Sequence, residues 1–197
     1  MLLAMPFPRR IDTDAITESA RAILEAGGPE ALTMRALARK LGVKAPSLYA
    51  YVENRDDLLR LLVAAGLQDL GTRLSAAAEE EPRDPSRRLV CLARAYIEFA
   101  GSAPQVFALM LGPGPPESRA SPELERATSA PVVQSAVELA GPGRGEVLAQ
   151  AVWSLVHGYS VLNLADRFKL NPDPRAAFFD GLDLLLRGAV ASARPGA

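Results

Sequence analysis

One segment of the sequence, residues 31–52, carries basic side chains and no acidic one. Its basic residues are Arg35, Arg39, Lys40 and Lys44. Guanidinium and ammonium groups at this density suit phosphate oxygens, which every nucleic acid presents whatever its sequence. The whole chain of 197 residues has a formal net charge of −1. Any attraction to nucleic acid must therefore come from this local patch and not from a global field.

The polar and small residues that follow Lys44 could contact DNA directly. Ser47 and the ring of Pro46 suit base edges or a thymine methyl group, whereas the hydroxyls of Tyr49 and Tyr51 suit phosphate oxygens. Ala50 would allow a close approach to the groove. Core packing remains the alternative for Tyr49, because an aromatic side chain on a short helix usually has one buried face. For Arg39 and Lys40 the alternative is simple solvation.

Two short helices would position these side chains. Thr33 is a good N-cap for a helix that ends at Leu41, and Gly42 suits a left-handed C-cap. A second helix begins near Ala45 and Pro46 and runs to about residue 52, since proline is tolerated in the first turn. Lys44 offers this second helix no side-chain acceptor, so a DNA phosphate or water is expected at its first amides.

A pair of short helices around a glycine-containing turn is the geometry that presents the second helix to the major groove of DNA. The string TMRALARKLGVKAPSLYAYVENRDDLL, residues 33–59, resembles the DNA-binding signature of the TetR family. The matching features include the Leu48-Tyr49-x-Tyr51-Val52 ending and the Asn54-Arg55-x-x-Leu58 start of the next helix. The resemblance covers roughly residues 11–60. It implies a dimeric helical repressor that a ligand releases from its operator.

The resemblance also implies residue roles. Arg35 would reach a base or a phosphate, and Arg55 would clamp a phosphate. The recognition helix would carry Lys44, Ala45, Pro46, Ser47, Tyr49, Ala50 and Tyr51. The partner would be a palindromic operator in double-stranded DNA, read by two recognition helices about one DNA turn, near 34 Å, apart.

The rest of the chain has the apolar spacing of α-helices, and no segment alternates as a strand does. The expected helices cover residues 12–27, 54–80, 87–101, 104–111, 122–139, 145–169 and 173–193. Residues 112–122 are rich in Gly, Pro and Ser and indicate a loop. We predict an all-α protein of about nine helices, with a three-helix helix-turn-helix DNA-binding domain at residues 1–55. Residues 56–197 would form a helical-bundle domain for ligand sensing and dimerisation.

Caps define two of these helices. Asn54 and Asp57 resemble an acidic capping box at the start of the long helix 54–80, whose length suits a connector between the two modules. Asp173 or Asn171 could cap the last helix.

The C-terminal half contains the string Trp153-Ser-Leu-Val-His157-Gly158, which resembles a pattern of one TetR regulatory-domain subgroup. A pocket for a mostly apolar effector could be lined by Tyr96, Phe99, Phe107, Met110, Trp153 and His157. Plain core packing is the alternative for this stripe, and a hydrogen-bonded core group is the alternative for His157. A dimer interface between helix pairs is expected at Leu148, Val152, Leu155, Phe178, Leu182 and Leu185.

The composition limits the other classes of function. With one histidine, one cysteine and no glycine-rich phosphate loop, the chain offers nothing that assembles an enzyme site. No metal is expected, because the carboxylates nearest His157 are badly spaced and Cys91 is remote in the sequence. No cofactor is expected either. A helix-turn-helix architectural protein without an effector remains the alternative function.

Location is inferred from the same composition. A single cysteine excludes an internal disulfide and fits a reducing compartment. The apolar N-terminal run is too short for the core of a signal peptide, and no uninterrupted apolar stretch approaches 18 residues. We therefore expect a cytoplasmic protein.

Overall fold

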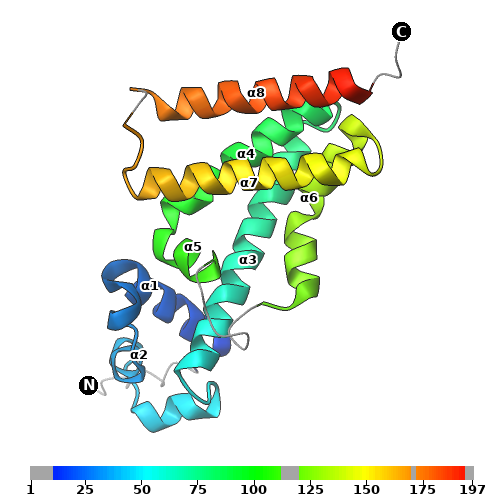
Figure 1. The fold of residues 1–197 in the computed structure, drawn as a ribbon. Helices are drawn as coiled ribbons and strands as arrows, with labels where there is room; N and C mark the ends of the chain where they lie inside the picture. The colour runs from blue at the N-terminus through cyan, green and yellow to red at the C-terminus, as the bar shows by residue number, and fades with distance from the viewer. Residues whose placement is uncertain (1–10, 112–119, 170–171, 194–197) are drawn as a thin grey trace, which may run out of the picture.

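The computed structural model describes residues 11–111, 120–169 and 172–193. In these ranges every regular element is a helix, and the helices are joined by turns and short loops (Figure 1). The elements are α1 (Thr13–Ala31), α2 (Met34–Leu41), the 3-10 helix η1 (Ala45–Ala50), α3 (Arg55–Glu80), α4 (Pro85–Ser102), α5 (Pro104–Leu111), α6 (Pro122–Ala140), α7 (Arg144–Leu164) and α8 (Pro174–Ala193). The predicted all-α class is confirmed. Most of the expected loop at 112–122 lies outside the described residues. None of the described helices is long and apolar enough to cross a membrane.

The first three helices form one end of the molecule, at the bottom left of Figure 1. Both predicted caps of α2 are present. The Thr33 hydroxyl accepts a hydrogen bond from Ala36 N at 3.1 Å, and Gly42 adopts a left-handed φ of 72°. Leu37 and Leu48 are completely buried, as their places in the helical pattern predict.

Helix α3 connects this end to the bundle formed by α4 to α8. The predicted N-cap is present, because Asn54 Oδ1 accepts from Asp57 N at 2.9 Å. The second half of the predicted capping box differs: Asp57 Oδ2 accepts from Glu53 N at 3.0 Å, one residue before the N-cap amide. The 26 residues of α3 span about 39 Å at 1.5 Å per residue. One side is buried along this whole length, from Leu58 near the start to Leu74 near the end. The connector is therefore a single continuous element.

In the bundle, α4 packs against α3, α6 and α7, while α7 and α8 lie side by side at the top of Figure 1. The core between these helices includes Leu89, Tyr96, Phe99 and Val152, each at most 2% exposed. Asp173 caps α8 by accepting a hydrogen bond from Ala176 N at 2.9 Å, as one of the two predicted alternatives.

Helix α7 ends at Leu164, five residues before the predicted end. Asp166 adopts a left-handed φ of 50°, and Arg167 N donates to Leu162 O at 2.9 Å. This 6→1 bond closes the last turn in the way that a glycine usually does. Phe168 then packs against Tyr159, with ring centroids 5.3 Å apart. The apolar spacing in the sequence predicted a longer helix, because Phe168 is apolar. In the structure Phe168 packs onto α7 from beyond its end.

The packing of α6 on α7 depends on Gly145, which is buried. A Cβ at this position would lie 2.7 Å from Val137 N, and a backbone atom cannot move aside as the end of a side chain can. We expect Gly145→Ala to lower the free energy of unfolding by roughly 1–3 kcal/mol. The midpoint of urea unfolding at one fixed protein concentration measures the effect.

The matched control is Gly101→Ala in α4, where a Cβ would meet nothing within 4 Å. Alanine favours the helix, so this variant should be neutral or more stable by up to ~1 kcal/mol. Equal destabilisation of both variants would contradict the close packing of α6 and α7.

Candidate nucleic-acid interface and effector groove

The second helix of the helix-turn-helix, η1, is a 3-10 helix and not the predicted α-helix to residue 52. Ser47 N donates to Lys44 O, and Tyr51 N donates to Leu48 O, both at 2.9 Å. Leu48 is completely buried and fixes this short turn to the core. The sequence pattern does not separate the two helix types here, because an element of one or two turns buries the same residues in either.

The side chains predicted to contact DNA lie on the outside of η1. Tyr49 is 54% exposed and Tyr51 is 43% exposed, so core packing does not account for Tyr49. Pro46, Ser47 and Ala50 are also exposed. Ala45 is the exception and is half-buried. The outer face of η1 therefore combines aromatic hydroxyls with small side chains.

Exposed basic side chains lie on α2, which packs against η1, and at the residue before η1. Arg35, Arg39 and Lys40 on α2 are exposed, and so is Lys44 before η1. None of these four residues forms an ion pair with another residue in the described ranges. The side chain of Lys44 gives η1 no capping hydrogen bond, as the sequence predicts. The four charges remain available to an external anion.

Arg55 has a structural role that the sequence did not reveal. Its Nη2 donates to Pro29 O at 2.9 Å and its Nε to Leu32 O at 3.4 Å. These carbonyls follow the break in α1 at Gly28, where φ is 71°. Arg55 thus fastens the corner between α1 and α2 to the start of α3. A guanidinium has five N–H donors, and these two bonds leave three of them. The predicted contact of Arg55 with a DNA phosphate could use those three and stays a prediction.

A groove of about 570 Å³ lies between α3, α5, α6 and α7. Its apolar lining includes Val63 and Leu67 from α3 and Val132 from α6. Polar groups come from α6 and α7, among them Thr128 and Gln150. The space is large enough for a small organic molecule, and its lining combines apolar area with a few hydrogen-bonding groups.

Two of the six predicted pocket residues, Met110 and Trp153, line this groove. Tyr96, Phe99 and Phe107 do not line this groove; they are at most 3% exposed and pack in the core, so a ligand contact for them stays a prediction. The rings of Tyr96 and Phe107 meet edge to face with centroids 5.7 Å apart. An aromatic stripe has the same spacing whether it faces a core or a cavity, so the sequence left this choice open.

His157 belongs to the same core contact. Its Nδ1 lies 3.1 Å from the hydroxyl of Tyr96, which favours the alternative of a hydrogen-bonded core histidine. Burial raises the pKa of Tyr96 far above its usual range, so the phenol stays neutral.

Sequence reasoning missed the groove residues from α3 and α6, including Leu67 and Thr128. The Thr128 hydroxyl lies 3.2 Å from Leu67 O of α3 and 2.9 Å from Leu124 O of its own helix, so α6 and α3 are in direct contact at this residue. The signal in the sequence was Thr128, a polar residue on the apolar side of α6, which could have indicated a groove at this position. The pairing of α3 with α6 depends on the whole bundle and leaves no local pattern in either helix.

The predicted dimer residues need correction. Leu148, Val152, Phe178 and Leu182 are at most 6% exposed and lie in the core of the protomer. Leu185 is half-buried, and only Leu155, at 36%, is exposed. Both helices have two apolar sides, and the periodicity did not indicate which one turns inward.

The outward apolar side of α7 and α8, here called the α7–α8 face, contains Leu155 and nine residues that were not predicted. Its residues are Val147, Ala151, Leu155, Gly158, Leu162, Ala177, Gly181, Leu184, Gly188 and Ala191. Val147 and Leu184 are each 71% exposed. The positions recur every three or four residues, so each helix presents one continuous stripe.

Two family models match the sequence. "Bacterial regulatory proteins, tetR family" matches residues 16–62, and "Tetracyclin repressor-like, C-terminal domain" matches residues 89–185. The uncharacterized HTH-type transcriptional regulator Rv0681 of Mycobacterium tuberculosis is 31% identical over 163 residues, which are 80% of this chain and 72% of that protein.

Solved structures share the fold. A protein of unknown function from Rhodococcus sp. RHA1 has a TM-score of 0.79 at 25% identity and covers 93% of this chain and 98% of its own. A TetR variant from Acinetobacter baumannii AYE in complex with minocycline has a TM-score of 0.69 at 26% identity and covers 94% of this chain and all of its own. The matched family and the named relative are transcriptional regulators, so an enzyme is excluded.

The contacts of Arg55 predict a measurable loss of stability. In Arg55→Ala the carbonyls of Pro29 and Leu32 lose their guanidinium donor, and we expect a destabilisation of roughly 1–2 kcal/mol. Thermal unfolding and faster amide exchange at residues 29–37 measure it. Arg83→Ala, which removes the same kind of side chain from an exposed position just beyond the end of α3, is the control. Unchanged stability in Arg55→Ala would contradict the structural role.

Proposed function

This chain belongs to the TetR family of transcriptional regulators, and we propose that it is a repressor that binds a palindromic operator as a homodimer and leaves it when a small molecule binds. The main support is that Ser47, Tyr49 and Tyr51 are exposed on η1, while the exposed basic residues of α2 and Lys44 form no ion pair within the described ranges. As a regulator of transcription it would act in the cytoplasm.

In the proposed complex, η1 enters the major groove. Ser47 and Pro46 approach base edges, while Tyr49, Tyr51 and Arg35 contact phosphates. The free donors of Arg55 can add a phosphate contact from the start of α3. Residues 1–55 would form the DNA-binding unit, with the boundary at the first residue of α3.

The α7–α8 face supports a homodimer. Three helical glycines on it, Gly158, Gly181 and Gly188, have nothing within 4 Å of an added Cβ. A glycine inside a helix costs about 1 kcal/mol relative to alanine, and no contact within the protomer requires these three. A second copy packed closely on the face would form a four-helix bundle around a two-fold axis.

The groove supports the ligand-responsive part of the proposal. Its lining suits a mostly apolar molecule with a few polar groups, held between Trp153 and the aliphatic side chains of α3. The structural neighbour solved with minocycline supports a small-molecule site in this fold. These two observations favour a ligand-released repressor over an architectural protein without an effector.

Base reading and phosphate binding predict different results for two variants. Arg35→Ala should weaken binding to every duplex and lower the slope of log affinity against log salt by about one unit. Ser47→Ala should instead lower the ratio of specific to non-specific affinity. Fluorescence anisotropy with the DNA upstream of the protein's own gene and with an unrelated duplex measures both quantities.

The control is Arg83→Ala, which removes an exposed charge beyond the far end of α3. If neither Ser47→Ala nor Pro46→Ala changed the affinity ratio, η1 would not be the recognition element.

Dimerisation through the α7–α8 face predicts that Leu184→Glu raises the dissociation constant of the dimer by about 100-fold or more, because the interface would bury an unpaired carboxylate. Analytical ultracentrifugation measures this constant. Ala127→Glu places the same charge at an exposed position of α6 that faces α3. This variant should leave the dissociation constant of the dimer unchanged. A Leu184→Glu protein that stays dimeric would show that the copies meet elsewhere.

A further inference from the structure

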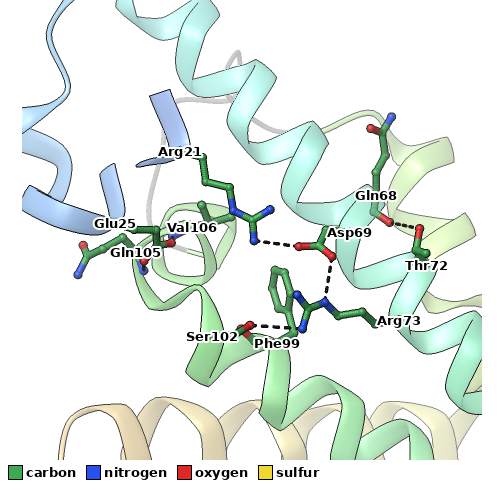
Figure 2. A network of polar contacts seen from close by, with 10 residues as sticks. All are labelled: Arg21, Glu25, Gln68, Asp69, Thr72, Arg73, Phe99, Ser102, Gln105 and Val106. Carbon is green, nitrogen blue, oxygen red and sulfur yellow. Dashed lines mark hydrogen bonds and ion pairs between the residues drawn. The ribbon is translucent and has the colours of Figure 1, made fainter. Parts of the chain in front are cut away.

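Polar contacts fasten α1 to the junction of α3, α4 and α5 at two points (Figure 2). We propose that Glu25 is a positioning residue that couples α5, and through it the groove, to the orientation of the helix-turn-helix. The inference rests on the proposed DNA-binding function. The two points of attachment are called here the Glu25 clamp and the Asp69 bridge.

The Glu25 clamp supplies a cap that α5 lacks in its own sequence. Ala103, the residue before α5, has no side-chain acceptor for the first amides of the helix. The carboxylate of Glu25, 80 residues earlier, accepts from Gln105 N at 3.1 Å and from Val106 N at 2.9 Å. A negative charge is also favoured at the positive end of a helix. The start of α5 is thus completed by a residue of α1.

The Asp69 bridge holds the same side of α1. Arg21, one turn before Glu25, donates from Nη2 to Asp69 Oδ2 at 2.9 Å, and Arg73 Nε donates to Asp69 Oδ1 at 2.9 Å. Partial burial alone would raise the pKa of Asp69, but the hydrogen bonds and charges of Arg73 and Arg21 outweigh it and lower the pKa. The carboxylate therefore stays ionised at neutral pH.

Arg73 extends this bridge to the end of α4. Its Nη1 donates to Ser102 Oγ at 3.3 Å, and its guanidinium lies 5.6 Å from the centroid of the Phe99 ring. The corner from α4 to α5 and the connector α3 are consequently held together beside α1. Rotation of α1 against this corner would break contacts at both attachments.

The other end of α5 reaches the groove. Met110 and Leu111 line it, while Val106 and Phe107 are buried. At Gly66 of α3 an added Cβ would lie 2.6 Å from Val106 Cγ1 and 2.7 Å from Met110 Sδ, so α5 rests directly on α3. A short helix packed this closely moves as one body, and a displacement at Met110 reaches the Glu25 clamp.

Coupling between two sites is reciprocal, so DNA itself can serve as the probe. The experiment is hydrogen–deuterium exchange of the full chain with and without a 30-base-pair duplex from upstream of its own gene. In the wild type we expect the duplex to slow exchange in residues 34–51 and also in residues 104–111. The second effect reports the coupling.

Glu25→Gln removes the charge of the clamp. In this variant we expect residues 34–51 to keep their protection by DNA, residues 104–111 to lose their response, and the amides of Gln105 and Val106 to exchange about tenfold faster or more. The matched control is Glu18→Gln, which removes the same charge from an exposed position on α1. It should behave as the wild type does.

Gly66→Ala tests the coupling from the groove side. The added methyl group should push α5 away from α3 and speed exchange in residues 104–111, although Glu25 is intact. Gly101→Ala, where an added Cβ meets open space, is its control.

The results separate the two proposals. Protection of residues 34–51 without any response in 104–111, or a response that persists in Glu25→Gln, would overturn the coupling and leave the DNA-binding function standing. No protection of residues 34–51 at low salt would overturn the proposed function and the coupling with it.

Discussion

Helix α1 contacts α2 on one side and α3 and α5 on the other, and its apolar residues Ile16, Ala20 and Leu24 are completely buried. Burial of apolar area is strong but not directional, so it holds α1 in place without fixing its rotation. Charge-assisted hydrogen bonds depend on geometry, and α1 makes them through Arg21 and Glu25 to two different elements. The orientation of α2 and η1, which follow α1, depends on this burial together with the hydrogen bonds of Arg21 and Glu25.

The elements beyond α1 are short and held at few points. Arg55 fixes the corner after Gly28, the caps of α2 limit its length, and Leu48 anchors η1. The exposed tyrosines and basic residues are therefore presented by a small unit attached to α1 and the start of α3. In the proposed dimer, the α7–α8 face would set the distance between two such units, and the proposed coupling through α5 would let a ligand in the groove change it.

Local signals in the sequence predicted the local structure well. The caps at Thr33, Gly42 and Asn54 depend on residues within one turn, and all three are present. The acid-free stretch at residues 31–52 likewise indicated an exposed basic surface. The burial of Leu148 and the structural contacts of Arg55 were not predicted, because both depend on which of several possible partners a side chain meets across the fold. One long-range feature did leave a local trace, because Ala103 before α5 indicates a helix whose cap must come from elsewhere.

Hydroxyl-radical footprinting of the full chain on the DNA upstream of its own gene tests the account most directly. A dimer that reads a palindrome should give two protected segments related by a dyad, with centres about one helical turn, near 34 Å, apart. A single unsymmetrical segment, or uniform protection without a repeat, would contradict a dimer that reads a palindrome through η1.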